Sequence, residues 1–163
     1  PIYFSYPFGE YSSEFKEIIK KYNFKFAFGQ HSGVIDVSKD FFELPRYPIN
    51  EKYGETERFK FIVNTIPFPF KAIYPENKYL LTSENPPSVK IIFFDEQKNL
   101  NNISCYSNEG NRWRKSKIYF EQKNILHIKI DEKFTTERGR INCSLNDNEG
   151  WRWLGIQYVI SEY

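Results

Sequence analysis

The sequence has few of the residues from which proteins most often build metal sites. Its 163 residues include no methionine, two cysteines and only two histidines, His31 and His127. A catalytic metal commonly takes about three protein ligands, and the chain contains neither an Asp-Asp pair nor a His-x-x-x-His spacing to supply them. We therefore expect no metal site in this chain. Because a natural reading frame begins with methionine, we also expect that Pro1 is not the native start.

Long runs of a single residue class are also missing. The apolar stretches are far shorter than a membrane-spanning helix. The 23 basic residues are interspersed with 21 acidic ones, which gives a net charge of +2. We expect no membrane span, and no nucleic-acid binding, because contacts with a phosphate backbone need clustered cations.

Aromatic residues are abundant instead, with 16 Phe, 12 Tyr and 3 Trp. Flat rings are typical of β-strands and of surfaces that bind sugars. The coding bias of an AT-rich genome is the alternative explanation, so only the position of an aromatic residue supports a role for it.

The first part of the chain predicts a βαβ unit. Residues 2–6 predict a strand that ends at the turn 7–9, a helix follows from a Ser12 or Ser13 cap, and residues 24–28 predict a second strand. The apolar face of the helix is predicted to consist of Phe15, Ile18, Ile19 and Tyr22. The strands of such a unit are parallel. A lone βαβ unit cannot bury its faces, so we expect the end of a larger α/β domain.

The middle of the chain predicts a second helix and then a linker. Residues 44–48 predict a short extended segment, because proline biases the preceding residue away from helix. Residues 55–65 predict a helix, with Phe59, Ile62, Val63 and Ile66 on one face. Residues 67–75 contain three prolines and predict a linker, which places a domain boundary near 69–75.

After this linker the pattern indicates strands separated by turns about every ten residues. The six runs with strand character are 89–94, 102–106, 112–120, 125–130, 140–145 and 151–160. This spacing is typical of an antiparallel β-sandwich. The predicted fold class is therefore α+β: a βαβ remnant of a distorted β/α barrel in residues 1–70, followed by an antiparallel β-sandwich in residues 71–163.

The two cysteines lie in similar surroundings. Both the segment from Cys105 to Trp113 and the segment from Cys143 to Trp153 run through Asn-Glu-Gly into a strand with Trp and Arg. Glycine suits a tight hairpin, so each segment predicts one. They are either two similar hairpins of one sandwich or a duplicated ligand-binding hairpin. The cysteines form either a disulfide or two buried thiols, depending on the compartment.

Three segments together resemble the polysaccharide deacetylase family of metal-dependent carbohydrate esterases. They are FSYPFGEY at 4–11, FGQHSG at 28–33 followed by LPRYP at 44–48, and RINC at 140–143 followed by WRWLGIQ at 151–157. The resemblance implies the C-terminal portion of a deacetylase-like protein, with its accessory β-sandwich. The family's metal-binding motifs are absent from this chain. We expect them upstream, with a divalent, zinc-like metal in the full-length parent and an inactive chain on its own.

The resemblance also implies site residues. The backbone N–H of Phe8 corresponds to an oxyanion donor. Ser5 stands where the family usually has arginine, and Arg46 is our candidate to supply the missing positive charge. His31 follows a predicted strand and is our candidate for a residue facing the active-site cleft. The alternatives are ordinary structural roles for all three, and His127 is expected to be structural.

The implied partner is a polysaccharide that contains N-acetylated amino sugars. In the hypothesis of a binding module, aromatic rings stack on the sugars; in a third, purely structural hypothesis, the tryptophans belong to the core. The candidate sugar-binding rings are those of Tyr6, Trp113, Trp151, Trp153 and Tyr158.

The resemblance favours a disulfide between the two cysteines, and a protein that is exported or belongs to the cell envelope. That location requires a signal upstream, and without one we expect a cytoplasmic protein. We also expect a homodimer formed through an exposed apolar sheet edge.

Overall fold

The computed structural model describes residues 1–95, 97 and 99–161. The fold is mixed α/β with most of its regular structure in strands, which form several sheets, none of them closed among the described residues. No helix in this part of the chain has the length and apolar character needed to cross a membrane. In chain order the elements are β1 (Tyr3–Ser5), α1 (Ser13–Lys21), β2 (Phe26–Phe28), α2 (Thr56–Val63), β3 (Ile66–Pro67), β4 (Phe70–Tyr74), β5 (Tyr79–Leu81), β6 (Val89–Phe93), β7 (Ser104–Ser107), β8 (Arg114–Lys115), β9 (Lys117–Gln122), β10 (Ile125–Lys129), β11 (Arg138–Asp147) and β12 (Gly150–Ser161).

The predicted βαβ unit is confirmed. Strands β1 and β2 are parallel neighbours, with Tyr3 opposite Phe26, and α1 lies between them in the chain. The helix begins where the sequence predicts it, because the Ser12 hydroxyl accepts a hydrogen bond from the N–H of Phe15 at 3.1 Å. Edge strand β1 has β2 as its one partner among the described residues, so association of two copies through this edge stays a prediction.

The predicted apolar faces of the helices are only half right. In α1, Ile19 is buried, whereas Ile18 and Tyr22 are exposed. In α2, Ile62 is buried, whereas Phe59 and Val63 are exposed. Part of the apolar face of α1 stays exposed because the helix packs on a sheet of two short strands and a small aromatic cluster. Together these cover less than the whole apolar face.

A third extended segment continues the parallel pair. Leu44 forms a parallel bridge with Phe28, its N–H donates to the Ala27 carbonyl at 3.0 Å, and its carbonyl accepts from the N–H of Gly29 at 2.9 Å. The extended segment predicted from residue 44 therefore lies beside β2. In space the order is β1, β2 and the Leu44 segment, all running in one direction.

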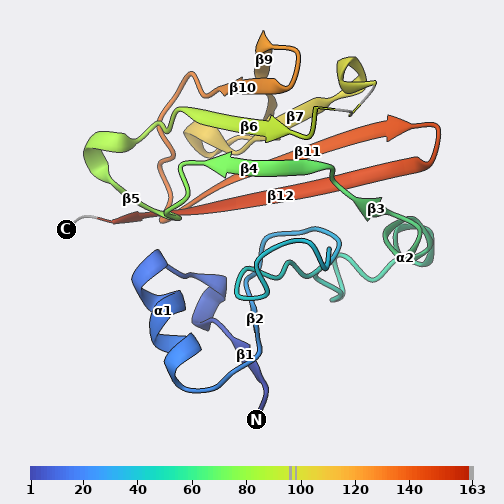
Figure 1. The fold of residues 1–163 in the computed structure, drawn as a ribbon. Coiled ribbons are helices and arrows are strands. Elements are labelled where there is room, and N and C mark those ends of the chain that lie inside the picture. The colour runs from blue at the N-terminus through green and yellow to red at the C-terminus, as the bar shows by residue number, and fades with distance from the viewer. Residues whose placement is uncertain (96, 98, 162–163) are drawn as a thin grey trace.

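The rest of the chain forms two larger sheets (Figure 1). One has the order β4-β6-β10-β9, and the other has the order β3-β12-β11-β7-β8, with β5 also paired to β12. Apolar side chains of both sheets, such as Ile91 and Leu126 from the first and Ile141 and Leu154 from the second, form one buried cluster. All six predicted runs contain strands, although the run 112–120 changes sheets at Ser116, between β8 and β9.

The predicted linker at 67–75 is wrong. Phe68 is buried in the large cluster, and β4 lies within the same stretch and pairs with β6. Prolines suggested a linker because they end helices. Among the described residues, however, the two-residue β3, which contains Pro67, has β12 as its one partner, and an edge strand tolerates proline. Because β3 pairs with β12, the larger sheet includes residues from both sides of the predicted domain boundary.

The two cysteines form a disulfide between β7 and β11, which resolves the alternative that the sequence left open. Cys105 lies directly opposite Cys143 in the strand register, and both are buried. The two similar segments are indeed turn-linked strand pairs, β7–β8 and β11–β12, in one sheet. Their turns contain Gly110 and Gly150, both with positive φ.

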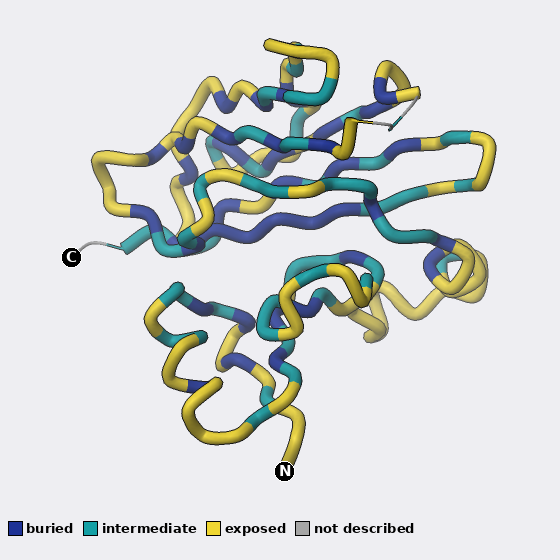
Figure 2. Tube along the Cα trace, viewed as in Figure 1, coloured by how far each residue is buried: buried dark blue, intermediate teal, exposed yellow. Residues whose placement is uncertain are grey.

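Strand β12 is covered on both faces. Residues 154–159 are all buried (Figure 2), although a strand at one surface of a sheet normally alternates between buried and exposed positions. One face of β12 contributes Leu154, Ile156 and Tyr158 to the large cluster. The other face, which we call the outer face, lies against the segment that contains α1, β1 and β2 (Figure 1). The candidate site lies at the interface on this outer face.

Candidate functional site

Three loops meet at one edge of the parallel segments. They follow β1, β2 and the Leu44 segment, and the carboxyl ends of adjacent parallel strands lie at the same edge of a sheet. The first loop contains Phe8, the second His31 and the third Arg46. The N–H of Arg46 donates to the carbonyl of His31 at 3.0 Å, which joins the second loop to the third. The three residues that the resemblance singled out thus lie in the loops that follow three neighbouring parallel segments.

The second loop packs directly on the outer face of β12. Gly33 forms an antiparallel bridge with Leu154. The indole N–H of Trp153 donates to the Ser32 hydroxyl at 2.8 Å, and that hydroxyl donates to Oδ1 of Asn142 at 3.2 Å. At Gly155 an added Cβ would lie 2.4 Å from the Ser32 carbonyl oxygen. Glycine at this position therefore allows the backbone of the loop to approach the sheet.

Between these loops, α2 and the outer face of β11 and β12 lies a cleft of about 680 Å³, which we call the aromatic cleft. Its rings come from elements far apart in the chain. The aromatic residues that line it are Tyr47, Tyr53, Phe61, Trp113 and Trp153. Polar groups lie among them, including the side-chain amides of Asn142 and Gln157 and the guanidinium groups of Arg46, Arg58 and Arg140. Such a mixture of flat apolar surface and hydrogen-bonding groups suits a polar ligand with apolar faces.

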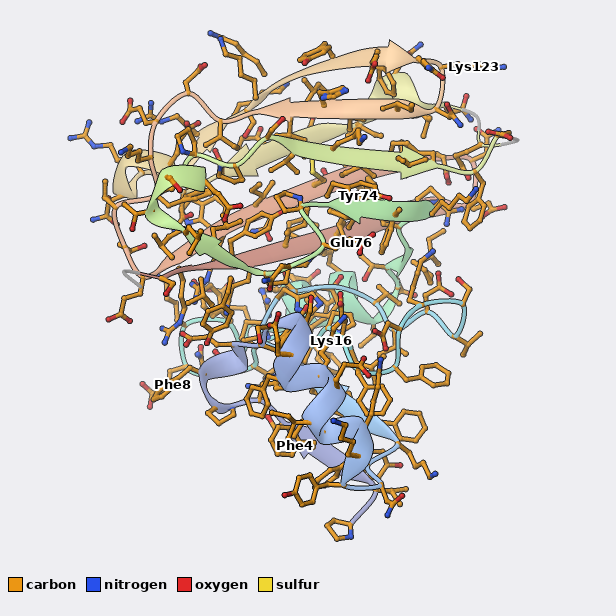
Figure 3. The ribbon with its side chains drawn as sticks, turned by 60° about the vertical axis from the view of Figure 1, so that its left-hand side comes forward. Phe4, Phe8, Lys16, Tyr74, Glu76 and Lys123 are labelled. Carbon is orange, nitrogen blue, oxygen red and sulfur yellow. A yellow bond between two sulfur atoms is a disulfide. The ribbon has the colours of Figure 1, made fainter. Side chains whose placement is uncertain are left out.

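Four of the sequence-predicted residues line this cleft: His31, Arg46, Trp113 and Trp153. Phe8 does not. Phe8, labelled in Figure 3, is 68% exposed. The centroid of its ring lies 5.3 Å from the guanidinium carbon of Arg138.

Tyr6 and Tyr158 require a correction. Tyr6 is 1% exposed, and its hydroxyl donates to the carbonyl of Phe42 at 3.1 Å. Tyr158 is fully buried in the large cluster, where burial raises the pKa of its phenol. Neither ring can stack on a sugar, because stacking needs an accessible ring face. The sequence places Tyr158 in a strand and Tyr6 next to a turn, and neither position indicates that the ring is buried.

Trp151 and Trp153 share one face of β12, as the sequence predicts. Both rings contact Phe61 of α2, with centroid distances of 6.1 and 6.4 Å. Neither belongs to the buried clusters, so the purely structural hypothesis, in which the tryptophans belong to the core, is wrong for these two residues. Trp153 lines the aromatic cleft with its indole N–H held by Ser32, whereas Trp151 is 46% exposed and lies outside the cleft lining.

His31 is an uncharged member of the cleft at neutral pH. Burial lowers the pKa of its imidazole to about 4, and the nearby Lys78 acts in the same direction, although Glu43 opposes both. A neutral imidazole can donate one hydrogen bond and accept another. His31 can therefore orient a ligand, but it adds no positive charge there. His127 instead stacks on Tyr119 and contacts Glu121, away from the cleft, in agreement with a structural role.

Arg46 lies beside Ser5, the position whose missing positive charge it was predicted to supply. Its Nη1 donates to the Ser5 hydroxyl at 3.1 Å. In the resemblance, residue 5 corresponds to an arginine, and the guanidinium group of Arg46 reaches this position from the third loop. The contact is exposed, and no described carboxylate forms an ion pair with Arg46.

A second cavity of about 380 Å³ is also lined by His31. Its charged groups largely satisfy one another: Lys16 pairs with Asp40 and Glu43, and the buried Lys78 donates to the carbonyls of Pro75 and Glu76. Burial lowers the pKa of Lys78. These contacts account for the cluster, and we assign no ligand to it.

The structure does not offer the family's metal ligands within the described residues. Among them, no group of three or more His, Cys, Asp or Glu side chains is placed to hold a metal ion.

Comparison with known proteins does not add a relative. No family model, no curated protein and no solved structure matches the chain. The resemblance to polysaccharide deacetylases, and every role taken from it, thus stays a hypothesis.

Proposed function

We propose that the chain binds a polysaccharide containing N-acetylated amino sugars in the aromatic cleft, as the C-terminal portion of a deacetylase-like protein. The observation that supports this most is the pairing of Trp113 and Trp153 with the amides of Asn142 and Gln157 in one cleft. Aromatic rings pack against the apolar faces of sugar rings. Amide groups can hydrogen-bond both hydroxyls and N-acetyl groups.

The arrangement of the chain supports the same proposal. In this account β1, β2 and the Leu44 segment are the last parallel segments of a β/α barrel, and the two larger sheets are its accessory sandwich. The shared apolar cluster of these sheets is what a sandwich requires. The Cys105–Cys143 disulfide suits a protein of the cell envelope or one that is exported, because such bonds persist in oxidising compartments.

A catalytic role for this chain has less support than binding. His31 and Arg46 line the cleft, but Phe8, the candidate oxyanion donor, does not. The described residues also hold no metal-ligand set. We therefore propose binding as the function of this part of the protein and derive no catalytic step from it.

The test is binding of chitohexaose and of a hyaluronan hexasaccharide, both of which contain N-acetylglucosamine. We expect Trp113→Ala to weaken binding about fivefold, because the stacking of one ring contributes roughly 1 kcal/mol. Trp113 is 53% exposed, so its loss should not unfold the chain. Isothermal titration calorimetry measures the effect.

Trp151→Ala is the matched control, since Trp151 is similarly exposed but lies outside the cleft lining. Its affinity should equal that of the unmodified chain. Absence of binding of both hexasaccharides would contradict the proposed function. So would a loss of affinity in Trp151→Ala with none in Trp113→Ala.

A further inference from the structure

The charged side chains that line the aromatic cleft are all positive. Three arginines line it, Arg46, Arg58 and Arg140, and no aspartate or glutamate is among its lining residues. The chain as a whole is nearly balanced, with 23 basic and 21 acidic residues. The positive charge of the cleft is therefore a local feature and does not reflect the composition of the chain.

These three arginines also differ in their partners from Arg114, Arg138 and Arg152. Arg114, Arg138 and Arg152 each form an ion pair with a carboxylate, that of Glu132, Glu10 and Asp147 respectively. In contrast, no described carboxylate lies within 4.0 Å of the three guanidinium groups of the cleft, and the hydrogen bonds described for them go to neutral oxygens. Their acceptors are the Ser5 hydroxyl for Arg46, the Pro48 and Tyr53 carbonyls for Arg58, and Oε1 of Gln157 for Arg140.

Each arginine comes from a different element, so the three guanidinium groups are held around one space. Arg46 lies in the loop after the Leu44 segment, Arg58 on α2 and Arg140 on β11. A guanidinium group presents several N–H donors in a planar fork, and each of these groups uses only one or two of its N–H bonds in the contacts above. The remaining donors match the geometry of a carboxylate.

We propose that the polymer held in the aromatic cleft is acidic: it carries sugar carboxylates in addition to N-acetylated amino sugars, and the cleft arginines bind those carboxylates. This inference rests on the proposed function, because it specifies the polymer for the same cleft. A neutral polymer would fill the same space and leave all three guanidinium groups without an anionic partner. Sulfate esters share the anionic chemistry, so the experiment includes them separately.

The experiment compares four probes with the full chain by calorimetry at low and high NaCl. They are a hyaluronan hexasaccharide, which carries carboxylates, chitohexaose, which is neutral, a keratan sulfate hexasaccharide, which carries sulfate esters but no carboxylate, and a single-stranded oligonucleotide. We expect the hyaluronan hexasaccharide to bind about tenfold more tightly than chitohexaose at low salt. This advantage should shrink as salt screens the charges.

The variants assign the preference to the cleft. Arg140→Gln should bring the affinity for the hyaluronan hexasaccharide down to about that of chitohexaose, and Arg46→Gln should act in the same direction. Arg46 serves as the second position because its described side-chain hydrogen bond is one exposed contact with Ser5. Arg112→Gln is the control: Arg112 is exposed, lies outside the cleft lining and should have no effect.

The outcomes separate the two proposals. Equal, salt-insensitive binding of the hyaluronan hexasaccharide and chitohexaose would overturn the acidic polymer and leave the proposed function standing. Absence of binding of both would remove the proposed function itself. Binding of the oligonucleotide or the sulfated hexasaccharide as tight as that of the hyaluronan hexasaccharide would also overturn the inference, because the cleft would then recognise anions without regard to sugar carboxylates.

Discussion

Replacing Cys105 and Cys143 by alanine is expected to lower the free energy of unfolding by about 4 kcal/mol, the largest effect on stability that we predict. The disulfide closes a loop across a sequence separation of 38 residues, and the loss of loop entropy in the unfolded chain accounts for a change of that size. Urea unfolding of the oxidised chain and of the double variant measures the difference.

A reducing agent provides the control for this comparison. It should move the unfolding midpoint of the unmodified chain towards that of the double variant and leave the double variant unchanged. Both cysteines are buried in the large cluster, so reduction should occur mainly on unfolding. An unmodified chain that unfolds at the same urea concentration as the double variant would refute the contribution we assign to the disulfide.

Gly155→Val is expected to have the second largest effect, because it should separate the second loop from the sheet. The added side chain would begin 2.4 Å from the Ser32 carbonyl oxygen and 2.6 Å from its nitrogen, which are backbone atoms and cannot rotate away. We expect a loss of stability of roughly 2–3 kcal/mol, as is usual for overpacking. We also expect loss of hexasaccharide binding, because the aromatic cleft needs the loop in place. Urea unfolding and calorimetry measure the two effects.

Asn146→Val provides a matched control for this prediction. Asn146 is exposed on the adjacent strand β11, opposite Trp151 in the register, and it lies outside the cleft lining. The same valine should cost little stability there and leave binding intact. If Gly155→Val bound the hexasaccharide as tightly as the unmodified chain, the packing of the loop on β12 would not be required for the cleft.

Local pattern was enough to predict most of the elements. The Ser12 cap and the period of the apolar residues located α1, and alternation located the strands from residue 89 onwards. Local pattern failed where the partner of a segment decides its structure. Residues 70–74 become a strand because β6 pairs with them, and proline composition does not show that partner.

The candidate site was predictable only in part, for a similar reason. His31, Arg46, Trp113 and Trp153 were found from motifs and from their place in strands or loops. Arg58 and Phe61 were missed, because α2 meets β12 only through packing of segments about ninety residues apart. Arg140 and Asn142 could have been found: they alternate with the core residues Ile141 and Cys143 on β11, which places them on the outer face.

The nitrogen–proton correlation spectrum of the three tryptophan indoles, recorded with and without a saturating hyaluronan hexasaccharide, tests the central claim most directly. The sequence has three tryptophans, so each indole signal can be assigned by a single Trp→Phe variant. The account predicts that the signals of Trp113 and Trp153 shift on binding while that of Trp151 stays in place. A bound hexasaccharide that moves only the Trp151 signal, or none of the three, would contradict binding in the aromatic cleft.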